Sequence, residues 1–403
     1  MGRQAITGYA NPGFEEVRDA FAANFERRGE LGAACCVYHY GEKVVDLWGG
    51  VRDKATGEPW EEDTMVIVFS ATKGMAALAM ALAHSRGLFD YDERVSTYWP
   101  EFGQEGKGGI TVRQLLSHQA GLFVLDEPLD AALLTDLDRL AAVLARQKPA
   151  WEPGTCQGYH AVTIGFYEGE LLRRVDPEHR SIGRYFQDEI ATPLELDFYI
   201  RVPDEIPDST LAPMHRPRAA RMMLTLFTMP PSLALAGMNS RSNLRRALLG
   251  SELPETEARG RVYARNLEVP AGGGVGTARA LARAYSEFAT GGKELGLCEE
   301  TLRELAAPAV LPTLRSRDEC LKVEAHYALG FSKPGPGYVF GHPSSYGAPG
   351  SGGSFGYADP HYQIGFGYVP NQMGTHLDDP RADALRKATY RSIGESDPYN
   401  AEG

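Results

Sequence analysis

The two ends of this chain carry β-type sequence patterns, and helical patterns fill the residues between them. Residues 33–40 and 43–48 are β-rich runs on either side of Gly41, as in a hairpin. Residues 327–331, 353–358 and 363–369 form a second β-rich group toward the other end. This order predicts an α/β (α+β) lobe made from both termini, with a helical lobe inserted between them.

The length of 403 residues also favours two lobes, because a single hydrophobic core usually stops growing below this size. We assign residues 1–88 and 265–403 to the α/β lobe and residues 89–264 to the mostly helical lobe, with the active site between the lobes. A capping-box pattern at Thr111 predicts a short helix that Gly121 closes. Periodicity predicts further helices at residues 14–28, 72–86, 136–147, 161–174, 278–290 and 379–392.

Charge, cysteine content and hydropathy exclude several kinds of partner and cellular location. The formal net charge is −12, whereas nucleic-acid-binding proteins normally present a basic face, so we expect no nucleic-acid partner. The five cysteines are odd in number and form no C-x-x-C motif, so we expect no disulfide framework and a cytoplasmic location. The first residues lack the apolar stretch of a secretory signal, and the longest apolar run, 75–83, is about half a membrane span, so we expect no membrane partner. These patterns do not predict an oligomeric state.

Ser70-Ala71-Thr72-Lys73 is an S-x-x-K motif at the start of a predicted helix. Residues three apart on a helix share one face, so the Ser70 hydroxyl and the Lys73 amine lie within reach of each other. The helix N-terminus adds unpaired N–H groups that can stabilise an oxyanion. A capping serine with a solvated lysine is the alternative. The apolar run 75–83 argues against it, because an unpaired lysine there would be costly to bury.

Tyr159 follows a Pro-Gly turn and directly precedes a predicted helix. Beside Ser70 and Lys73 it can act as a general base if its pKa falls by roughly two to three units from about 10, a shift that a nearby ammonium favours. A neutral Lys73 is the other candidate base, and the sequence leaves both open. Tyr159 alone is also consistent with a packed loop tyrosine.

A glycine-rich segment, residues 346–360, leads into a predicted strand. Glycines let a substrate lie close to the backbone, and an edge strand offers N–H groups to a carbonyl oxygen. A plain glycine-rich turn is the alternative.

In this order, the three segments resemble the serine β-lactamase and penicillin-binding-protein superfamily, and the chain is most similar to the family VIII carboxylesterases. The resemblance implies a β-lactamase/transpeptidase-like fold of the class C type, a central antiparallel sheet flanked by helices plus an inserted helical domain. It covers nearly the whole chain and is strongest at residues 44–50, 69–74, 98–102, 110–122, 158–174 and 271–284.

The resemblance also implies roles for individual residues. Ser70 matches the acylated nucleophile, and Lys73 matches the lysine that shares protons with it. Tyr159 matches the tyrosine that serves as general base and later as acid to the leaving alcohol. Ser351 follows the third motif, so its N–H is expected to form an oxyanion hole with that of Ser70, with Gly350 in the same substrate-binding segment.

Two departures from the lactamase pattern favour neutral esters over penicillins. Ala161 stands where lactamases commonly have asparagine, and Ala348-Pro349-Gly350 stands where they have Lys-Thr-Gly. Loss of a charge-assisted contact to a β-lactam carboxylate costs about 1.5–3 kcal/mol. A second alignment begins the third motif at Gly341-His342-Pro343, which would put His342 near the pocket in place of Ala348.

Other candidate groups fit less well. Ser354 lies in a G-x-S-x-G pattern, but the residues after it are β-type, whereas a nucleophile elbow needs a helix there. Cys156 has no evident histidine partner, and His118 is expected to be structural. The ten histidines show no metal-ligand spacing, so we expect no metal and no cofactor.

We therefore expect a serine hydrolase that cleaves short-chain carboxylic esters through an acyl-enzyme on Ser70, with a small-molecule ester as its partner. The preference for short acyl chains rests on the resemblance alone. A β-lactamase, a D-amino-acid peptidase or an acyltransferase of the same fold is the alternative. A catalytically inactive binding protein is more remote, because Ser70, Lys73 and Tyr159 are all present.

Overall fold

The computed structural model describes residues 6–217, 239, 242–249, 265, 267–375 and 378–395. Most of the segment 218–266, where the predicted helical lobe ends and the α/β lobe resumes, lies outside the described residues. The division into two lobes therefore remains a prediction.

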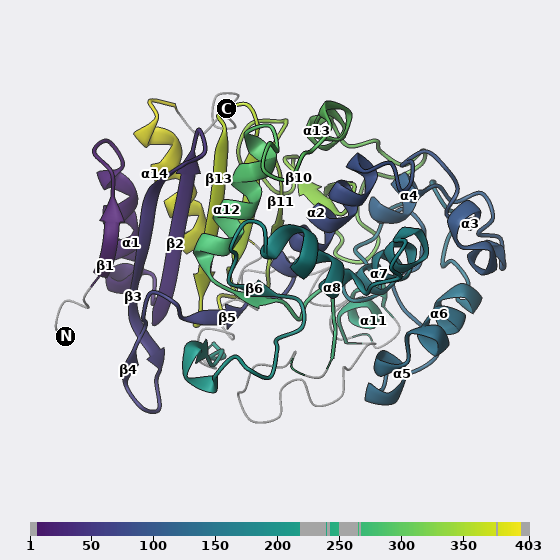
Figure 1. The fold of residues 1–403 in the computed structure, drawn as a ribbon, viewed down its shortest axis with the longest axis horizontal. Coiled ribbons are helices and arrows are strands. Elements are labelled where there is room, and N and C mark those ends of the chain that lie inside the picture. The colour runs from purple at the N-terminus through teal and green to yellow at the C-terminus, as the bar shows by residue number, and fades with distance from the viewer. Residues whose placement is uncertain are drawn as a thin grey trace.

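A nine-stranded sheet joins the two ends of the chain, in the order β1-β3-β2-β13-β12-β11-β10-β9, with β4 added beside β3 (Figure 1). Every pairing in it is antiparallel. The two ends meet at β2 and β13, where Val37 lies opposite Phe366. The predicted central antiparallel sheet is confirmed. Its strands are β1 (Ile6–Ala10), β2 (Gly32–His39), β3 (Glu42–Asp53), β4 (Glu58–Pro59), β9 (His326–Ala328), β10 (Phe331–Lys333), β11 (Tyr346–Pro349), β12 (Phe355–Asp359) and β13 (Ile364–Pro370).

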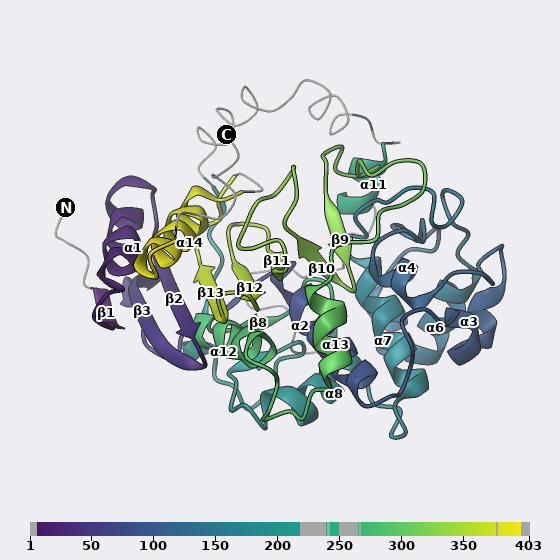
Figure 2. The ribbon, with the colours of Figure 1, turned by 90° about the horizontal axis from the view of Figure 1, so that it is seen from above.

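Helices cover both faces of this sheet (Figure 2). α1 (Glu15–Arg27) and α14 (Pro380–Ser392) pack together on one face, and α12 (Ala278–Ala289) lies on the other. Ile364, Phe366 and Tyr368 of β13 pack toward α1 and α14. Gly365 and Gly367 alternate with them and face α12, and a Cβ on Gly367 would lie 2.2 Å from the Ala278 carbonyl oxygen. These two glycines therefore let α12 approach β13 closely.

A four-stranded sheet holds the start of the central helix α2 (Ala71–Ser85). Its order is β6-β8-β5-β7, from β5 (Met65–Ile67), β6 (Phe198–Tyr199), β7 (Leu211–Ala212) and β8 (Val275–Gly276). Every residue of α2 from Ala71 to Ala83 is buried, against α7 (Thr163–Val175), α8 (Ile182–Phe186) and β11. Burial along its length fixes the position of the residue that begins it, Ser70.

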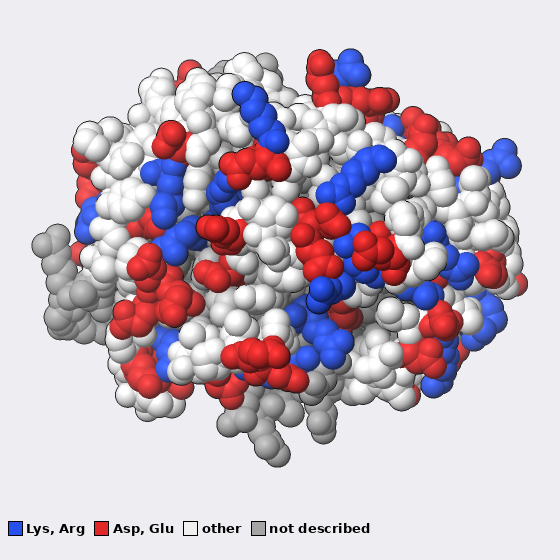
Figure 3. Space-filling view, in the orientation of Figure 1, with Lys and Arg blue, Asp and Glu red and all other residues white. Residues whose placement is uncertain are grey.

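The other described helices lie mainly beyond α2, on the right of Figure 1. They are α3 (Val95–Tyr98), α4 (Val112–Leu116), α5 (Ala131–Thr135), α6 (Leu137–Arg146), α11 (Asn243–Leu249) and α13 (Glu299–Ala306), with 3₁₀ turns at Pro100–Gly103 and Asp208–Thr210 and a π turn at Gln187–Ala191. None of the described helices combines the length and apolar character needed to cross a membrane. On the face in Figure 3, acidic and basic side chains are interspersed.

The capping box at Thr111 is confirmed, but the predicted closure of its helix at Gly121 is wrong. The helix ends at Leu116, and His118 takes the left-handed conformation with φ 59°. The N–H of Gln119 donates to the Gln114 carbonyl and that of His118 to the Leu115 carbonyl, which is a Schellman termination. Glycine usually fills the left-handed position. Here a buried histidine fills it, so composition alone could not locate the helix end.

The single strand predicted over residues 327–331 is also wrong, because it is the hairpin of β9 and β10. Its two turn residues, Leu329 and Gly330, have φ of 52° and 90°. Both positive values are typical of a type I′ turn, which usually carries Asn-Gly or Asp-Gly. Leu-Gly lacks that signal, so the turn is not evident in the sequence.

Gly367→Ala tests the close approach of α12 to β13. The new methyl group would overlap the Ala278 carbonyl, so we expect unfolding free energy to fall by about 1–3 kcal/mol. Gly109→Ala is the matched control, because nothing lies within 4 Å of its Cβ position. Urea denaturation of both variants measures the difference, and equal stabilities would contradict the packing described.

Candidate active site

A strained turn between β5 and α2 presents Ser70. Phe69, immediately before it, has φ 47°, which is rare for a bulky residue and typical of functional turns. The Phe69 carbonyl accepts bonds from the Thr72 amide, at 2.9 Å, and from its Oγ1, at 2.5 Å. Ser70 begins the helix but makes no side-chain capping bond. Its hydroxyl is therefore not used to cap the helix that positions it.

Lys73 is buried one turn further along α2, with 3% of its surface exposed. Nζ lies 2.7 Å from the carbonyl oxygens of both Ala161 and Ala271, and 3.2 Å from Ser70 Oγ. An ammonium can donate to all three oxygens. A neutral amine can donate to the two carbonyls and accept a proton from Ser70. The arrangement thus accommodates either the protonated or the neutral amine of Lys73. In both forms Nζ lies within hydrogen-bond distance of Ser70 Oγ.

Tyr159 lies in the loop before α7, with its ring beside Lys73. Lys73 Nζ is 4.7 Å from the ring centroid. The ring stacks on Tyr327 with centroids 6.0 Å apart, and the Tyr159 amide donates to Asp318 Oδ2 at 2.9 Å. The Tyr327 hydroxyl donates to the same carboxylate oxygen at 2.7 Å. Asp318 therefore fixes both the backbone of Tyr159 and the ring on which it stacks.

Two buried histidines support the Tyr159 loop. His160 Nδ1 bonds the Gly158 carbonyl and Nε2 accepts from the Leu122 amide, while His118 Nδ1 accepts from the His160 amide. Burial lowers the pKa of His160 to about 4 and that of His118 well below its ordinary value. Both rings are therefore neutral near pH 7. This geometry agrees with the structural role expected for His118.

The glycine-rich segment lies against the first turn of α2. A Cβ on Gly350 would fall 2.2 Å from the Val68 carbonyl oxygen and 3.2 Å from the Ala71 amide nitrogen, so only glycine permits this contact. Within the described part of the chain, the N–H groups of Ser70 and Ser351 have no hydrogen-bond acceptor. Two N–H groups on adjoining segments are thus available for an oxyanion.

The structure separates the two alignments of the third motif. Ala348 lies on β11 beside α2, where a Cβ on Gly74 would be 3.2 Å from its methyl group. His342 lies near the opposite end of that strand, stacked on His361 with ring centroids 3.9 Å apart. The structure therefore places Gly350 against the first turn of α2 and Ala348 one turn further along this helix, whereas His342 packs on His361. Ser351 follows Gly350 in the chain.

The alternative nucleophiles lack the arrangement of Ser70. Ser354 is 2% exposed, donates to the Val68 carbonyl at 2.7 Å and precedes a strand rather than a helix. Cys156 forms a β-bridge with Arg315, and all five cysteines are unpaired. No group of three or more His, Cys, Asp or Glu side chains in the described ranges could hold a metal ion.

Glu168, on α7, is a buried carboxyl near the site that the sequence analysis missed. It has no exposed surface, and neither carboxyl oxygen has a partner among the described residues. Burial raises its pKa to about 8, and the charge of Lys73 opposes the shift. Its position offered a signal, because it shares one helix face with the apolar Ile164, Leu171 and Leu172. Asp318 gave no comparable signal, since its partner Tyr159 is 159 residues away.

Glu168→Gln tests whether the pKa of the buried Glu168 carboxyl is raised. The pKa of Glu168 is higher in the folded chain than the ordinary 4.5, so its contribution to stability is complete below pH 4.5 and is lost as pH rises toward 8. One such group contributes a slope of at most about 1.4 kcal/mol per pH unit. We expect the substitution to flatten the stability profile between pH 5 and 8, measured by urea denaturation.

Glu170→Gln is the matched control on the same helix. Glu170 is paired with Arg173 at 2.8 Å and with Arg174 at 2.6 Å. Its substitution should lower stability but leave the slope of the unmodified protein. Identical slopes in Glu168→Gln and the unmodified protein would contradict the raised pKa of Glu168.

Comparison with known proteins establishes the family of the chain. The family model described as Beta-lactamase matches residues 17–391. The chain belongs to the β-lactamase family. This membership confirms the predicted β-lactamase/transpeptidase-like fold.

Named relatives support the predicted resemblance. The chain is 34% identical over 384 residues to "Esterase/beta-lactamase LipL" of Mycobacterium tuberculosis, covering 91% of this chain and 83% of that protein. A crystal structure of a family VIII carboxylesterase is 37% identical, with a TM-score of 0.80 over 96% of this chain and 100% of the other. A penicillin-binding-protein homologue from Caulobacter crescentus is 35% identical, with a TM-score of 0.81 over the same shares. The resemblance to family VIII carboxylesterases is confirmed.

Proposed function

We propose that this chain hydrolyses short-chain carboxylic esters through an acyl-enzyme on Ser70. The observation that carries the proposal is the 3.2 Å contact between Lys73 Nζ and Ser70 Oγ, at a helix start where the Ser70 N–H has no acceptor among the described residues. The names of the relatives, an esterase/β-lactamase and a family VIII carboxylesterase, support ester hydrolysis. The unpaired cysteines support a cytoplasmic location, because thiols persist in a reducing compartment.

The residues suggest the order of steps. Ser70 Oγ attacks the ester carbonyl carbon while its proton passes to the pair formed by Lys73 and Tyr159. The N–H groups of Ser70 and Ser351 hold the negative oxygen of the tetrahedral intermediate. The alcohol leaves with the proton held by the pair, and the acyl group stays on Ser70. Water then attacks the acyl carbon by the same proton path, which releases the acid and restores Ser70.

Ala348 supports neutral esters as substrates. Its short, buried side chain has no charge to pair with a β-lactam carboxylate. β-Lactam hydrolysis is the second candidate, because the relative LipL is named an esterase/β-lactamase. Side-by-side turnover of p-nitrophenyl acetate and a chromogenic cephalosporin distinguishes the two. We expect the ester to have a kcat/KM at least roughly ten-fold higher, and preferred cephalosporin turnover would overturn the ester assignment.

Ser70→Ala tests the nucleophile directly. Incubation with a fluorophosphonate followed by intact-protein mass spectrometry should show one covalent adduct on the unmodified protein and none on this variant. Ser354→Ala is the matched control and should retain the adduct, because Ser354 Oγ is bound to the Val68 carbonyl. An adduct that persists on Ser70→Ala would move the chemistry to Ser354 or Cys156.

Tyr159→Phe tests the shared proton path. The substitution keeps the ring beside Lys73 and removes only the hydroxyl, so kcat for p-nitrophenyl acetate should fall on the order of 10²-fold or more. The control is the fluorophosphonate adduct on Ser70, which shows that the nucleophile remains accessible. A kcat close to that of the unmodified protein would assign the base role to Lys73 alone.

A further inference from the structure

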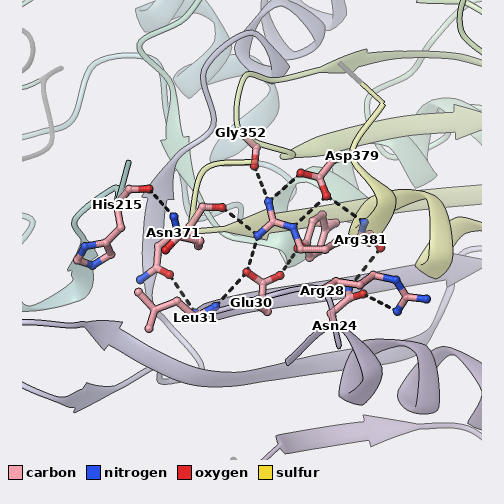
Figure 4. Close-up of polar contacts among 12 residues, drawn as sticks. Asn24, Arg28, Glu30, Leu31, His215, Gly352, Asn371, Asp379 and Arg381 are labelled. Atoms are coloured by element: carbon pink, nitrogen blue, oxygen red, sulfur yellow. Dashed lines mark hydrogen bonds and ion pairs between the residues drawn. The ribbon is translucent and has the colours of Figure 1, made fainter. Parts of the chain in front are cut away.

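Arg381 is a buried arginine whose five N–H groups all have acceptors (Figure 4). Only 3% of the residue is exposed. Nε and one Nη2 proton bond the two carboxylate oxygens of Asp379, at 2.9 and 2.8 Å. One Nη1 proton bonds Glu30 at 2.8 Å. The remaining two bond backbone carbonyls of Gln372, at 2.9 Å, and Gly352, at 2.8 Å.

These acceptors belong to separate parts of the chain. Glu30 precedes β2, Gln372 follows β13 and Asp379 is the N-cap of α14, whose backbone it also bonds. Gly352 lies in the glycine-rich turn that carries Ser351. The planar guanidinium therefore links this turn to three surrounding segments through five hydrogen bonds. A lysine ammonium has only three donors and cannot make all of these bonds.

The turn itself, residues 350–353, is held from two sides. Its own bond runs from the Gly353 amide to the Gly350 carbonyl, and Gly352 has φ 89°. On one side Gly350 touches the start of α2, as described above. On the other, the Gly352 carbonyl accepts from Arg381 and, at 2.9 Å, from the Gly374 amide. A Cβ on Gly353 would lie 2.7 Å from Asp379 Oδ2, so the Asp379–Arg381 pair lies directly against the turn.

We propose that Arg381 is a positioning residue for the oxyanion hole. Through the Gly352 carbonyl, its guanidinium sets where the N–H of Ser351 lies relative to Ser70. An oxyanion donor stabilises the transition state only if it lies at hydrogen-bond distance from the developing charge, so a displaced turn lowers kcat more than substrate binding. The inference rests on the proposed function of Ser70 and Ser351 and adds a residue outside the reacting groups.

Arg381→Lys tests it, with Arg386→Lys as the matched control. Arg386 lies on the same helix and is 2% exposed, and it bonds Asp383 rather than the turn. Both substitutions keep a positive charge and disturb a buried arginine. The readouts are kcat and KM for p-nitrophenyl acetate, the inhibition constant of phenylboronic acid, and the melting temperature. The boronate forms a tetrahedral adduct on serine, and its oxygen reports on the oxyanion hole.

We expect Arg381→Lys to lower kcat roughly ten-fold or more, with KM within about three-fold and the boronate inhibition constant raised by a factor similar to the loss of kcat. Arg386→Lys should keep kcat within about two-fold and lower the melting temperature less, because only its Nη2 is hydrogen-bonded among the described residues. A purely structural role of Arg381 predicts equal kcat values in the two variants, and that result would overturn the proposal. A fall in kcat without weaker boronate binding would overturn it as well.

Asp379→Asn keeps the test decisive if Arg381→Lys does not fold. The substitution retains the oxygen that caps α14 but puts an amide NH₂ group in place of the carboxylate oxygen that now accepts from Arg381 Nη2. It should therefore shift the guanidinium and lower kcat, as expected for Arg381→Lys. Unchanged kcat in this variant would then overturn the proposal. Ser70→Ala tests the proposed function separately from the role of Arg381. Persistent esterase activity in that variant would contradict the proposed function, whatever the result for Arg381→Lys.

Discussion

The buried amine of Lys73 is the contact on which the arrangement of the site depends. Its Nζ donates to the carbonyls of Ala161 and Ala271, which are 88 and 198 residues away in the chain. The third contact of Nζ is with Ser70 Oγ. Burying an amine is unfavourable unless its polar contacts are satisfied, so the site is stable only when all these segments are in place. The same interaction therefore stabilises the packing around α2 and holds the amine beside Ser70 Oγ, the proposed nucleophile.

Local sequence patterns predicted the local parts of this arrangement. The spacing from Ser70 to Lys73, the Thr111 capping box and the helical periodicity each depend on neighbours in the chain, and the structure has the corresponding helices. The errors arose where a residue adopts a backbone conformation that its type disfavours. His118 ends a helix in place of a glycine, and Leu329 begins a turn that normally starts with asparagine or aspartate.

The supports of the candidate site could not be predicted, because they are contacts between distant residues. Asp318 bonds the amide of Tyr159 from 159 residues further along the chain, and Arg381 bonds the Gly352 carbonyl from the start of α14. Neither has a spacing that a single sequence can reveal. The choice between Ala348 and His342 likewise depends on which end of β11 faces α2, which only the sheet register establishes.

The seam between β2 and β13 has a consequence for how the chain acquires its activity during synthesis. β2 pairs with a strand made more than three hundred residues later, and Glu30 bonds Arg381 across a separation of 351 residues. Contacts this far apart form late and slowly in folding. A nascent chain that already contains Ser70, Lys73 and Tyr159 would therefore lack the Arg381 contact to the turn 350–353, the proposed oxyanion segment, until α14 has emerged from the ribosome. Catalytic competence would then be one of the last properties that the folding chain gains.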